Sequence, residues 1–183
     1  MYLADFHRKY ARQLLDLDTQ GFEHSYRALQ KDLGGVEQWP DRHRGHRRTV
    51  SSFMVSALLI PTLAGATRAA SAEAVTTYGA LALWARAEDG IPMPVACPRT
   101  EQGTFFDALD EIIGNPALAA TVARIDLAWR RRIAVIHFTD GTYTPFTEAG
   151  PESSDERARS LGRELVRSCP GPLLAAVARD LAA

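Results

Sequence analysis

The chain has 183 residues, of which 46% are hydrophobic and 23% are charged, and its formal net charge is −1. This length is typical of a single domain that buries enough apolar surface to fold without disulfide bonds or a metal. A net charge so close to zero excludes a globally basic nucleic-acid-binding protein, although a local basic patch is still allowed. We therefore expect one globular domain spanning residues 1–183.

The two cysteines, Cys97 and Cys169, are far apart in the sequence and have no CxxC spacing. This arrangement predicts neither a zinc ribbon nor a redox pair, so we expect two buried or half-buried thiols. The first residues contain no apolar stretch followed by a small-residue cleavage site, and so they do not resemble a signal peptide. These features predict a cytoplasmic protein that holds no cofactor and no metal.

Apolar residues recur at helical spacing between Leu3 and Leu33, in two series that are offset near residues 18–21. This pattern predicts one kinked helix or two helices in tandem, ended by the glycine pair at 34–35. Residues 36–48 are polar and contain Pro40 and Gly45, which predicts a loop.

Residues 50–67 form a run of 18 residues without a charge, near the shortest length that can span a membrane. Five hydroxyl side chains, Pro61 and Gly65 dilute its hydrophobicity, so we expect a buried core helix over 50–64, capped by Thr49 or Ser51, and no membrane contact. A second helix is expected over 71–86. Because it is apolar on nearly every face, it should lie at the centre of the domain.

The three prolines between residues 89 and 103 predict an irregular connection. Thr104 and Asp107 then resemble a capping box that opens a helix ending at Gly114. Asn115 followed by Pro116 is typical of a helix start, and apolar residues at 118, 122, 125 and 129 predict that this helix continues to Arg132.

Residues 133–139 are rich in β-branched and aromatic side chains, and the Asp140-Gly141 pair that follows them is typical of a tight turn. We therefore expect a β-hairpin over about 133–147. A lone hairpin is barely stable, so one face should pack on helices or pair with a second copy across a dimer axis. Ser153 with Glu156 should open a helix that ends at Cys169, and Pro172 should start the last helix.

Together these elements predict a mostly α fold. It would be a compact helical bundle of about six or seven helices, all-α apart from one late β-hairpin at about 133–147.

Residues 41–48 form an arginine-rich loop that follows Trp39 and precedes a predicted helix start. Guanidinium groups, free helix N–H groups and a stackable indole can together hold a phosphate or a nucleic-acid backbone. The alternative is a solvated loop whose arginines pair with carboxylates of the chain. His43 and His46 do not predict a metal site, because two imidazoles beside four cations attract a metal ion poorly. The candidate anion-binding residues are Trp39, Arg42, Arg44, Arg47, Arg48 and Arg130.

Two side chains are candidates for catalysis. His137 is either a half-exposed strand residue or a general acid or base in a cleft between the hairpin and the helices. Cys97 is either a buried inert thiol or a nucleophile activated by His137. Tyr143 is a further candidate neighbour of His137.

Three classes of function follow, and the sequence leaves open whether the protein is an enzyme. The first is a non-enzymatic binding or regulatory protein, forming a homo-oligomer, that recognises a protein partner or a small ligand. It leads because the chain contains no motif of a known nucleophile or of paired catalytic carboxylates. The second is nucleic-acid or phosphate binding through residues 42–48, joined by Arg130–Arg132. The third is a small enzyme that uses His137 as its acid or base.

Overall fold

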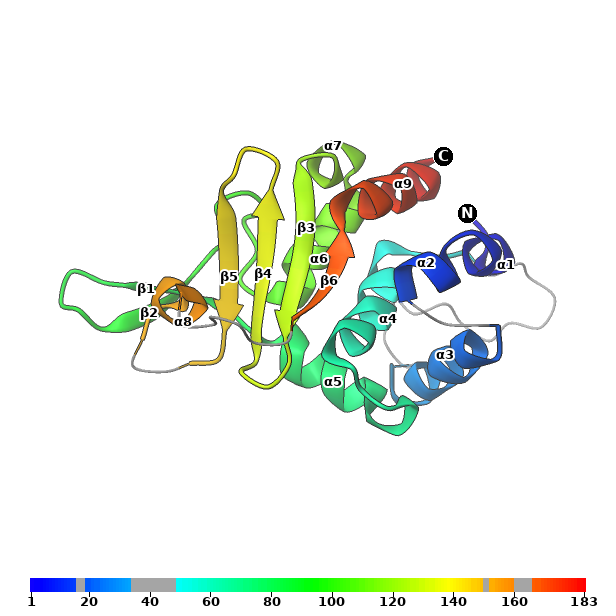
Figure 1. Cartoon of the computed structure of the whole chain (residues 1–183), viewed down its shortest axis with the longest axis horizontal. Coiled ribbons are helices and arrows are strands. Elements are labelled where there is room, and N and C mark those ends of the chain that lie inside the picture. Colours follow the sequence, from blue (N-terminus) through cyan, green and yellow to red (C-terminus); the bar gives the residue numbers. More distant parts are fainter. Residues whose placement is uncertain (16–18, 34–48, 150–151, 160–165) are drawn as a thin grey trace.

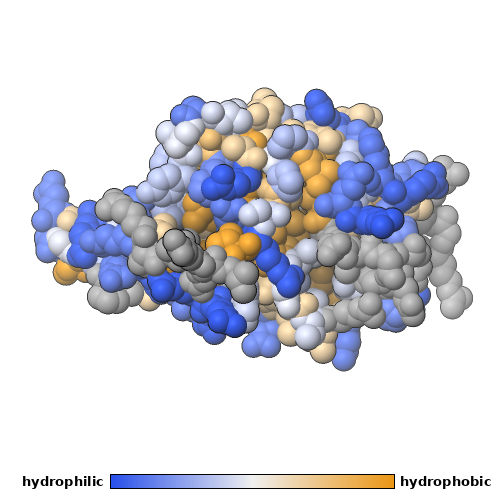
Figure 2. Space-filling view, viewed as in Figure 1, coloured by the Kyte–Doolittle hydropathy of each residue, from blue (hydrophilic) through white to orange (hydrophobic). Residues whose placement is uncertain are grey.

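The computed structural model describes residues 1–15, 19–33, 49–149, 152–159 and 166–183 of the chain. Figure 1 shows the N-terminal helices at one end of the long axis, a four-stranded sheet in the middle and a two-stranded hairpin projecting at the other end. On the face shown in Figure 2, hydrophobic residues gather toward the middle of the molecule and hydrophilic residues dominate both ends.

Helices occur along the whole described chain, whereas the strands of both sheets all lie after residue 82. The helices are α1 (Leu3–Phe6), a π-helical turn (His7–Ala11), α2 (Arg12–Leu15), α3 (Thr19–Leu33), α4 (Ser52–Ala64), a 3-10 turn (Arg68–Ala70), α5 (Ser71–Gly79), α6 (Phe105–Gly114), α7 (Pro116–Ala119), α8 (Ser154–Arg159) and α9 (Gly171–Ala182). The strands are β1 (Leu83–Arg86), β2 (Pro92–Val95), β3 (Val122–Ala128), β4 (Ile133–Phe138), β5 (Tyr143–Thr147) and β6 (Arg167–Pro170). β1 pairs with β2, and the larger sheet has the order β5-β4-β3-β6, with every pair antiparallel.

Helix α4 lies in the core, because every residue from Met54 to Ala64 except Thr62 is buried. Ser51 caps its start by accepting a hydrogen bond from the backbone N–H of Met54 at 3.2 Å, and Gly65 ends it in the left-handed conformation. The prediction of a buried core helix is therefore confirmed. Among the described residues, no helix is long and apolar enough to cross a membrane.

The inner face of the larger sheet packs against α6 and α9. Ile125, Ile136 and Phe146 are completely buried on this face. The ring of Phe146 lies 5.6 Å from that of Phe105 on α6, and Leu174 of α9 belongs to the same core. Burial of these side chains is the main force that holds the sheet to its helices.

The predicted fold class, a mostly α domain or helical bundle with one hairpin, is wrong. The described residues form two antiparallel sheets, of two and four strands, beside the helices. The hairpin itself is confirmed, since β4 pairs with β5 around the Asp140-Gly141 turn. It is held inside a larger sheet by β3, so it does not depend on a second copy of the chain for its pairing.

The helix predicted over 71–86 ends at Gly79, and Leu83–Arg86 is a strand. A short apolar run is typical of a strand as well as of a central helix, and the apolar pattern alone does not separate the two. The connection predicted to be irregular contains strand β2, although two of its four residues are prolines. Prolines are tolerated there because β2 is an edge strand.

Two further helices were predicted too long. The capping by Asn115 is confirmed, because its side chain accepts a hydrogen bond from the N–H of Ala117 at 3.1 Å. However, α7 ends at Ala119, and residues 122–128 form β3. Likewise Ser153 caps α8, but Cys169 lies in strand β6 rather than at the end of that helix. In both cases the segment forms a strand because β3 and β6 pair with each other. This pairing outweighs the helical spacing of the apolar residues in each segment.

We predict that Gly171→Ala destabilises the fold strongly. A Cβ at Gly171 would lie 1.8 Å from the backbone oxygen of Val122, so α9 could not keep its contact with β3. We expect a loss of at least about 1–3 kcal/mol in the free energy of unfolding, measured by urea denaturation. Gly103→Ala is the control, because a Cβ there meets nothing within 4 Å, and it should change stability by no more than about 0.5 kcal/mol. Equal stability of the two variants would contradict this packing argument.

Candidate functional site

A polar cluster on the outer face of the larger sheet is centred on Asp126. One carboxylate oxygen, Oδ2, lies 2.9 Å from Nε2 of His137 and 2.9 Å from Nε of Arg124. The other, Oδ1, accepts a hydrogen bond from the hydroxyl of Ser168 at 2.6 Å. Three strands, β3, β4 and β6, thus supply donors to one carboxylate, whose side chain is only 14% exposed.

Strand pairing brings these side chains together. Arg124 is opposite His137 in the β3–β4 register, and Asp126 is opposite Ser168 in the β3–β6 register. Tyr143 is opposite His137 on β5, with the two ring centroids 6.2 Å apart. Because side chains alternate along a strand, these polar residues share the outer face, while their neighbours face the core.

The environment of His137 favours the neutral imidazole. Burial lowers its pKa below the usual 6.5, and the charge of Arg124 lowers it further, whereas Asp126 acts in the opposite direction. Asp126 can accept a hydrogen bond only from a protonated Nε2, so the neutral ring carries its free electron pair on Nδ1. Nδ1 has no hydrogen-bond partner among the described residues. A histidine held by a carboxylate and open at its second nitrogen can act as a general base.

Cys97 does not join this cluster. Its side chain is completely buried, and its sulfur lies 4.0 Å from the hydroxyl of Thr144. Thr144 is opposite Ile136 and so faces the core, on the other side of the sheet from His137. The structure therefore separates the two residues predicted as a possible nucleophile and base. The other thiol, Cys169, is also buried, and burial raises its pKa to about 12.

A second candidate site lies where the β3–β4 turn meets α8. A pocket of about 510 Å³ opens here, and we call it the arginine pocket. Its lining residues are Arg130, Arg131, Arg132, Ile133, Glu148, Glu152 and Arg157. Four guanidinium groups thus face two carboxylates, which leaves an excess of positive charge.

Several contacts fix the walls of the arginine pocket. Arg132 forms an ion pair with Glu148, and Arg157 donates a hydrogen bond to the backbone oxygen of Glu148 at 2.7 Å. The guanidinium carbon of Arg130 lies 5.0 Å from the centre of the Trp129 ring, and Trp129 is 37% exposed. This is a cation–π contact at an accessible surface.

Of the residues predicted to bind an anion, only Arg130 is among the residues that the structure describes, and it lines the arginine pocket. Trp39, Arg42, Arg44, Arg47 and Arg48 lie outside the described residues, and their role stays a prediction. The two candidate sites share the outer face of the sheet, with a small buried apolar cluster of Ala128, Ile133 and Val135 between them.

Asp126, Arg124 and Ser168 were not predicted from the sequence as site residues. The segment 124–127 alternates charged and apolar residues, and this signal of a strand was available. For Ser168 there was no signal, because its partner lies 42 residues away in the sequence.

We predict opposite shifts of the His137 pKa in two variants. Removing the cation in Arg124→Gln should raise this pKa, and removing the anion in Asp126→Asn should lower it. The pKa of each variant can be measured from the imidazole chemical shifts in an NMR titration. Circular dichroism should confirm that both variants are folded. Shifts of the same sign, or no shift in either variant, would show that these side chains do not surround His137 in solution.

The same pKa shift predicts a pH dependence of stability. In the folded protein the pKa of His137 is below the unfolded value of 6.5, so between these two values the unfolded chain binds more protons. The free energy of unfolding should therefore fall as the pH falls from about 6.5 through the folded pKa. His137→Gln should make the fall in this range shallower in urea denaturation at several pH values. An unchanged profile would contradict this prediction.

The described residues contain no group of three or more histidine, cysteine, aspartate or glutamate side chains placed to hold a metal. Comparison of the chain with protein-family models, with curated proteins and with solved structures finds no match.

Proposed function

We propose that the protein is a binding module for a phosphate-bearing ligand, which it holds in the arginine pocket. The observation that carries this proposal is the pocket lined by four arginines against two glutamates. Guanidinium groups form paired, charge-assisted hydrogen bonds with phosphate oxygens, and this geometry suits them better than lysines.

Arg130 is the residue best placed to meet the ligand. It has no hydrogen-bond partner among the described residues, and its one contact there is with the Trp129 ring. Its donors can therefore turn to a phosphate without breaking an ion pair. Stacked aromatic and guanidinium groups also offer a flat surface on which a nucleobase can lie. Nucleotides and single-stranded nucleic acid are thus the phosphate-bearing ligands that we favour.

Backbone strain supports a role for this turn. Arg132 has a φ of 51°, in the left-handed region that residues with a Cβ rarely adopt. Such a conformation is costly and tends to be kept where it positions functional groups. Here it belongs to the turn that presents three consecutive arginines.

This proposal keeps the non-enzymatic binding protein as the leading function. The loop at 42–48 remains a predicted second source of arginines for the same ligand. A cytoplasmic location and assembly into a homo-oligomer also remain predictions.

We predict that Arg130→Gln together with Arg131→Gln weakens binding of a fluorescein-labelled single-stranded thymidine oligonucleotide by about tenfold or more. The loss of one charge-assisted hydrogen bond would account for such an effect. Fluorescence anisotropy should also show a shallower dependence of affinity on salt, because fewer counterions are released.

The matched control is Arg8→Gln together with Arg179→Gln, which removes the same charge from exposed positions on other helices. It should leave the affinity near that of the unmodified protein. Competition with inorganic pyrophosphate would show that phosphate alone is recognised. If both double variants bind equally, the arginine pocket is not the site.

A small acid–base enzyme is the second candidate, and the 2.9 Å contact between His137 and Asp126 favours it. If the protein converts the ligand that it binds, His137→Gln should abolish turnover in a mass-spectrometric assay without weakening binding in the arginine pocket. Turnover that survives this substitution would remove His137 as the base.

A further inference from the structure

The hairpin of β1 and β2, which we call the arm, projects from the rest of the molecule (Figure 1). Its register runs from the Leu83–Val95 pair at the base to the Arg86–Pro92 pair near the tip. The turn is closed by a hydrogen bond from the N–H of Ala87 to the oxygen of Ile91 at 3.0 Å. A two-stranded hairpin is barely stable in water by itself, so other parts of the molecule must support it.

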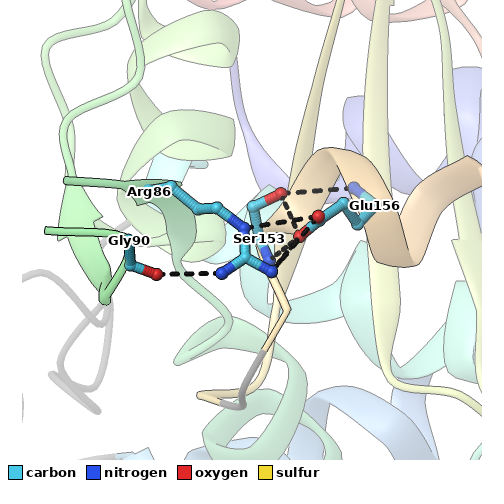
Figure 3. Close-up of polar contacts among 4 residues, drawn as sticks. All are labelled: Arg86, Gly90, Ser153 and Glu156. Atoms are coloured by element: carbon cyan, nitrogen blue, oxygen red, sulfur yellow. Dashed lines mark hydrogen bonds and ion pairs between the residues drawn. The ribbon is translucent and has the colours of Figure 1, made fainter. Parts of the chain in front are cut away.

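Helix α8 supports one face of the arm. The N–H of Trp84 donates to the hydroxyl of Ser154 at 2.8 Å. The guanidinium group of Arg86 contacts Glu156, with a shortest distance of 3.1 Å, and it also donates to the oxygen of Gly90 at 2.9 Å (Figure 3). Glu156 is fixed in turn by Ser153. These hydrogen bonds lower the pKa of Glu156 to about 2, so it is ionised at neutral pH.

The opposite face of the arm is entirely apolar. Side chains alternate along each strand, so the face away from Trp84 and Arg86 carries one set of residues. This set is Leu83, Ala85, Ala87, Ile91, Met93 and Val95. Leu83, at the base, packs against the core of its own chain, so the free part of this face lies toward the tip. Ile91 is 62% exposed and Met93 is 48% exposed, and they are the two most exposed large hydrophobic residues of the described chain. Clustered exposed apolar residues on a fixed support are typical of an interaction surface.

The outer edge of β2 offers few backbone N–H donors to a further strand. In an antiparallel pair of strands, hydrogen-bonded and non-hydrogen-bonded residue pairs alternate. Ala87 and Ile91 form a hydrogen-bonded pair, so Pro92 and Pro94 belong to non-hydrogen-bonded pairs and their backbone nitrogens point away from β1. Neither proline has an N–H group, and such residues protect an edge from pairing. We therefore expect recognition to use the side chains of the apolar face rather than strand addition at this edge.

We propose that this apolar face docks against the same face of a second copy of the chain. The face has no charge and no polar side chain, so it does not suit a phosphate-bearing or charged partner. Toward the tip the register also suits self-association, because Ile91 and Met93 on β2 lie opposite the alanines at positions 87 and 85 on β1.

A two-fold axis parallel to the strands makes the two faces fit. It places β2 of one copy over β1 of the other, so that Met93 lies over the partner's alanine at position 85 and Ile91 over the alanine at position 87. Sheets stack face to face about 10 Å apart in this way. Such an interface uses the same residues on both copies, as in most protein dimers.

The docking face offers six side chains from each copy, far fewer than the roughly 20–30 residues a side of a standard interface. We therefore expect a dimer that forms reversibly and depends on protein concentration. The proposal uses none of the residues that line the arginine pocket, so either proposal can fail without the other.

Sedimentation velocity over a range of concentrations tests the docking. The unmodified chain should shift from monomer to dimer, whereas Ile91→Glu together with Met93→Glu should stay monomeric, because four carboxylates would be buried in the interface. Tyr2→Glu together with Val166→Glu is the control, since these exposed hydrophobic residues lie elsewhere, and it should dimerise normally. An unmodified chain that is monomeric at its highest soluble concentration would overturn the proposal. So would equal dimerisation of the two double variants.

Disulfide trapping tests the orientation of the axis. One chain carries Ala85→Cys and a second chain carries Met93→Cys, while the native thiols Cys97 and Cys169 are buried and do not interfere. After mild oxidation of the mixture, intact mass spectrometry should show the mixed dimer as the main cross-linked product. A predominance of either cross-linked chain with itself would overturn the proposed axis.

Discussion

Strand β3 is the element on which both the core and the candidate sites depend. It pairs with β4 on one side and with β6 on the other, and it contacts helix α9. Its inner side chains, Ile125 and Leu127, are completely buried, while Arg124 and Asp126 alternate with them on the outer face. The start of α9 is fixed by the same strand, because Gly171 approaches the backbone of Val122 too closely for any side chain. A change in the register of β3 would therefore disturb the core and the polar cluster together.

The polar cluster has a structural explanation as well as a chemical one. A carboxylate as buried as Asp126 must be paired to be tolerated, and Arg124, His137 and Ser168 satisfy it. These contacts are sufficient reason for the cluster to exist, so they do not show catalysis by themselves. The pairing of Asp126 does not explain one feature of the cluster: Nδ1 of His137 has no hydrogen-bond partner among the described residues. For this reason the arginine pocket carries the proposed function, and His137 carries the alternative.

The parts of the fold that sequence predicts well are those with local causes. Thr104 and Asn115 cap helices as their spacing indicates, and the pairing of His137 with Tyr143 follows from a turn centred on Asp140. Strands β1, β3 and β6 were predicted as helix because short apolar or alternating runs fit both patterns. The pairing of β3 with β6 is distant in the sequence, and β1 is held by the neighbouring strand β2 and by Ser154 of α8. In β3, apolar residues at 122 and 125 fit a helix as well as a strand. The arginine pocket could be predicted only in part, since Arg157 reaches it from α8 through a tertiary contact.

Helix α8 links the two surfaces for which we make proposals. Two consecutive residues of α8 have different contacts. Glu156 forms an ion pair with Arg86 of the arm, whereas Arg157 lines the arginine pocket and donates a hydrogen bond to the backbone oxygen of Glu148. A substitution at Arg157 would therefore change the charge of the arginine pocket and also remove the hydrogen bond that joins α8 to Glu148. Arg130 has no such double role, because its contact among the described residues is the neighbouring Trp129 ring. Effects of substituting Arg130 can thus be assigned to the pocket, and effects of substituting Ile91 or Met93 can be assigned to the apolar face of the arm.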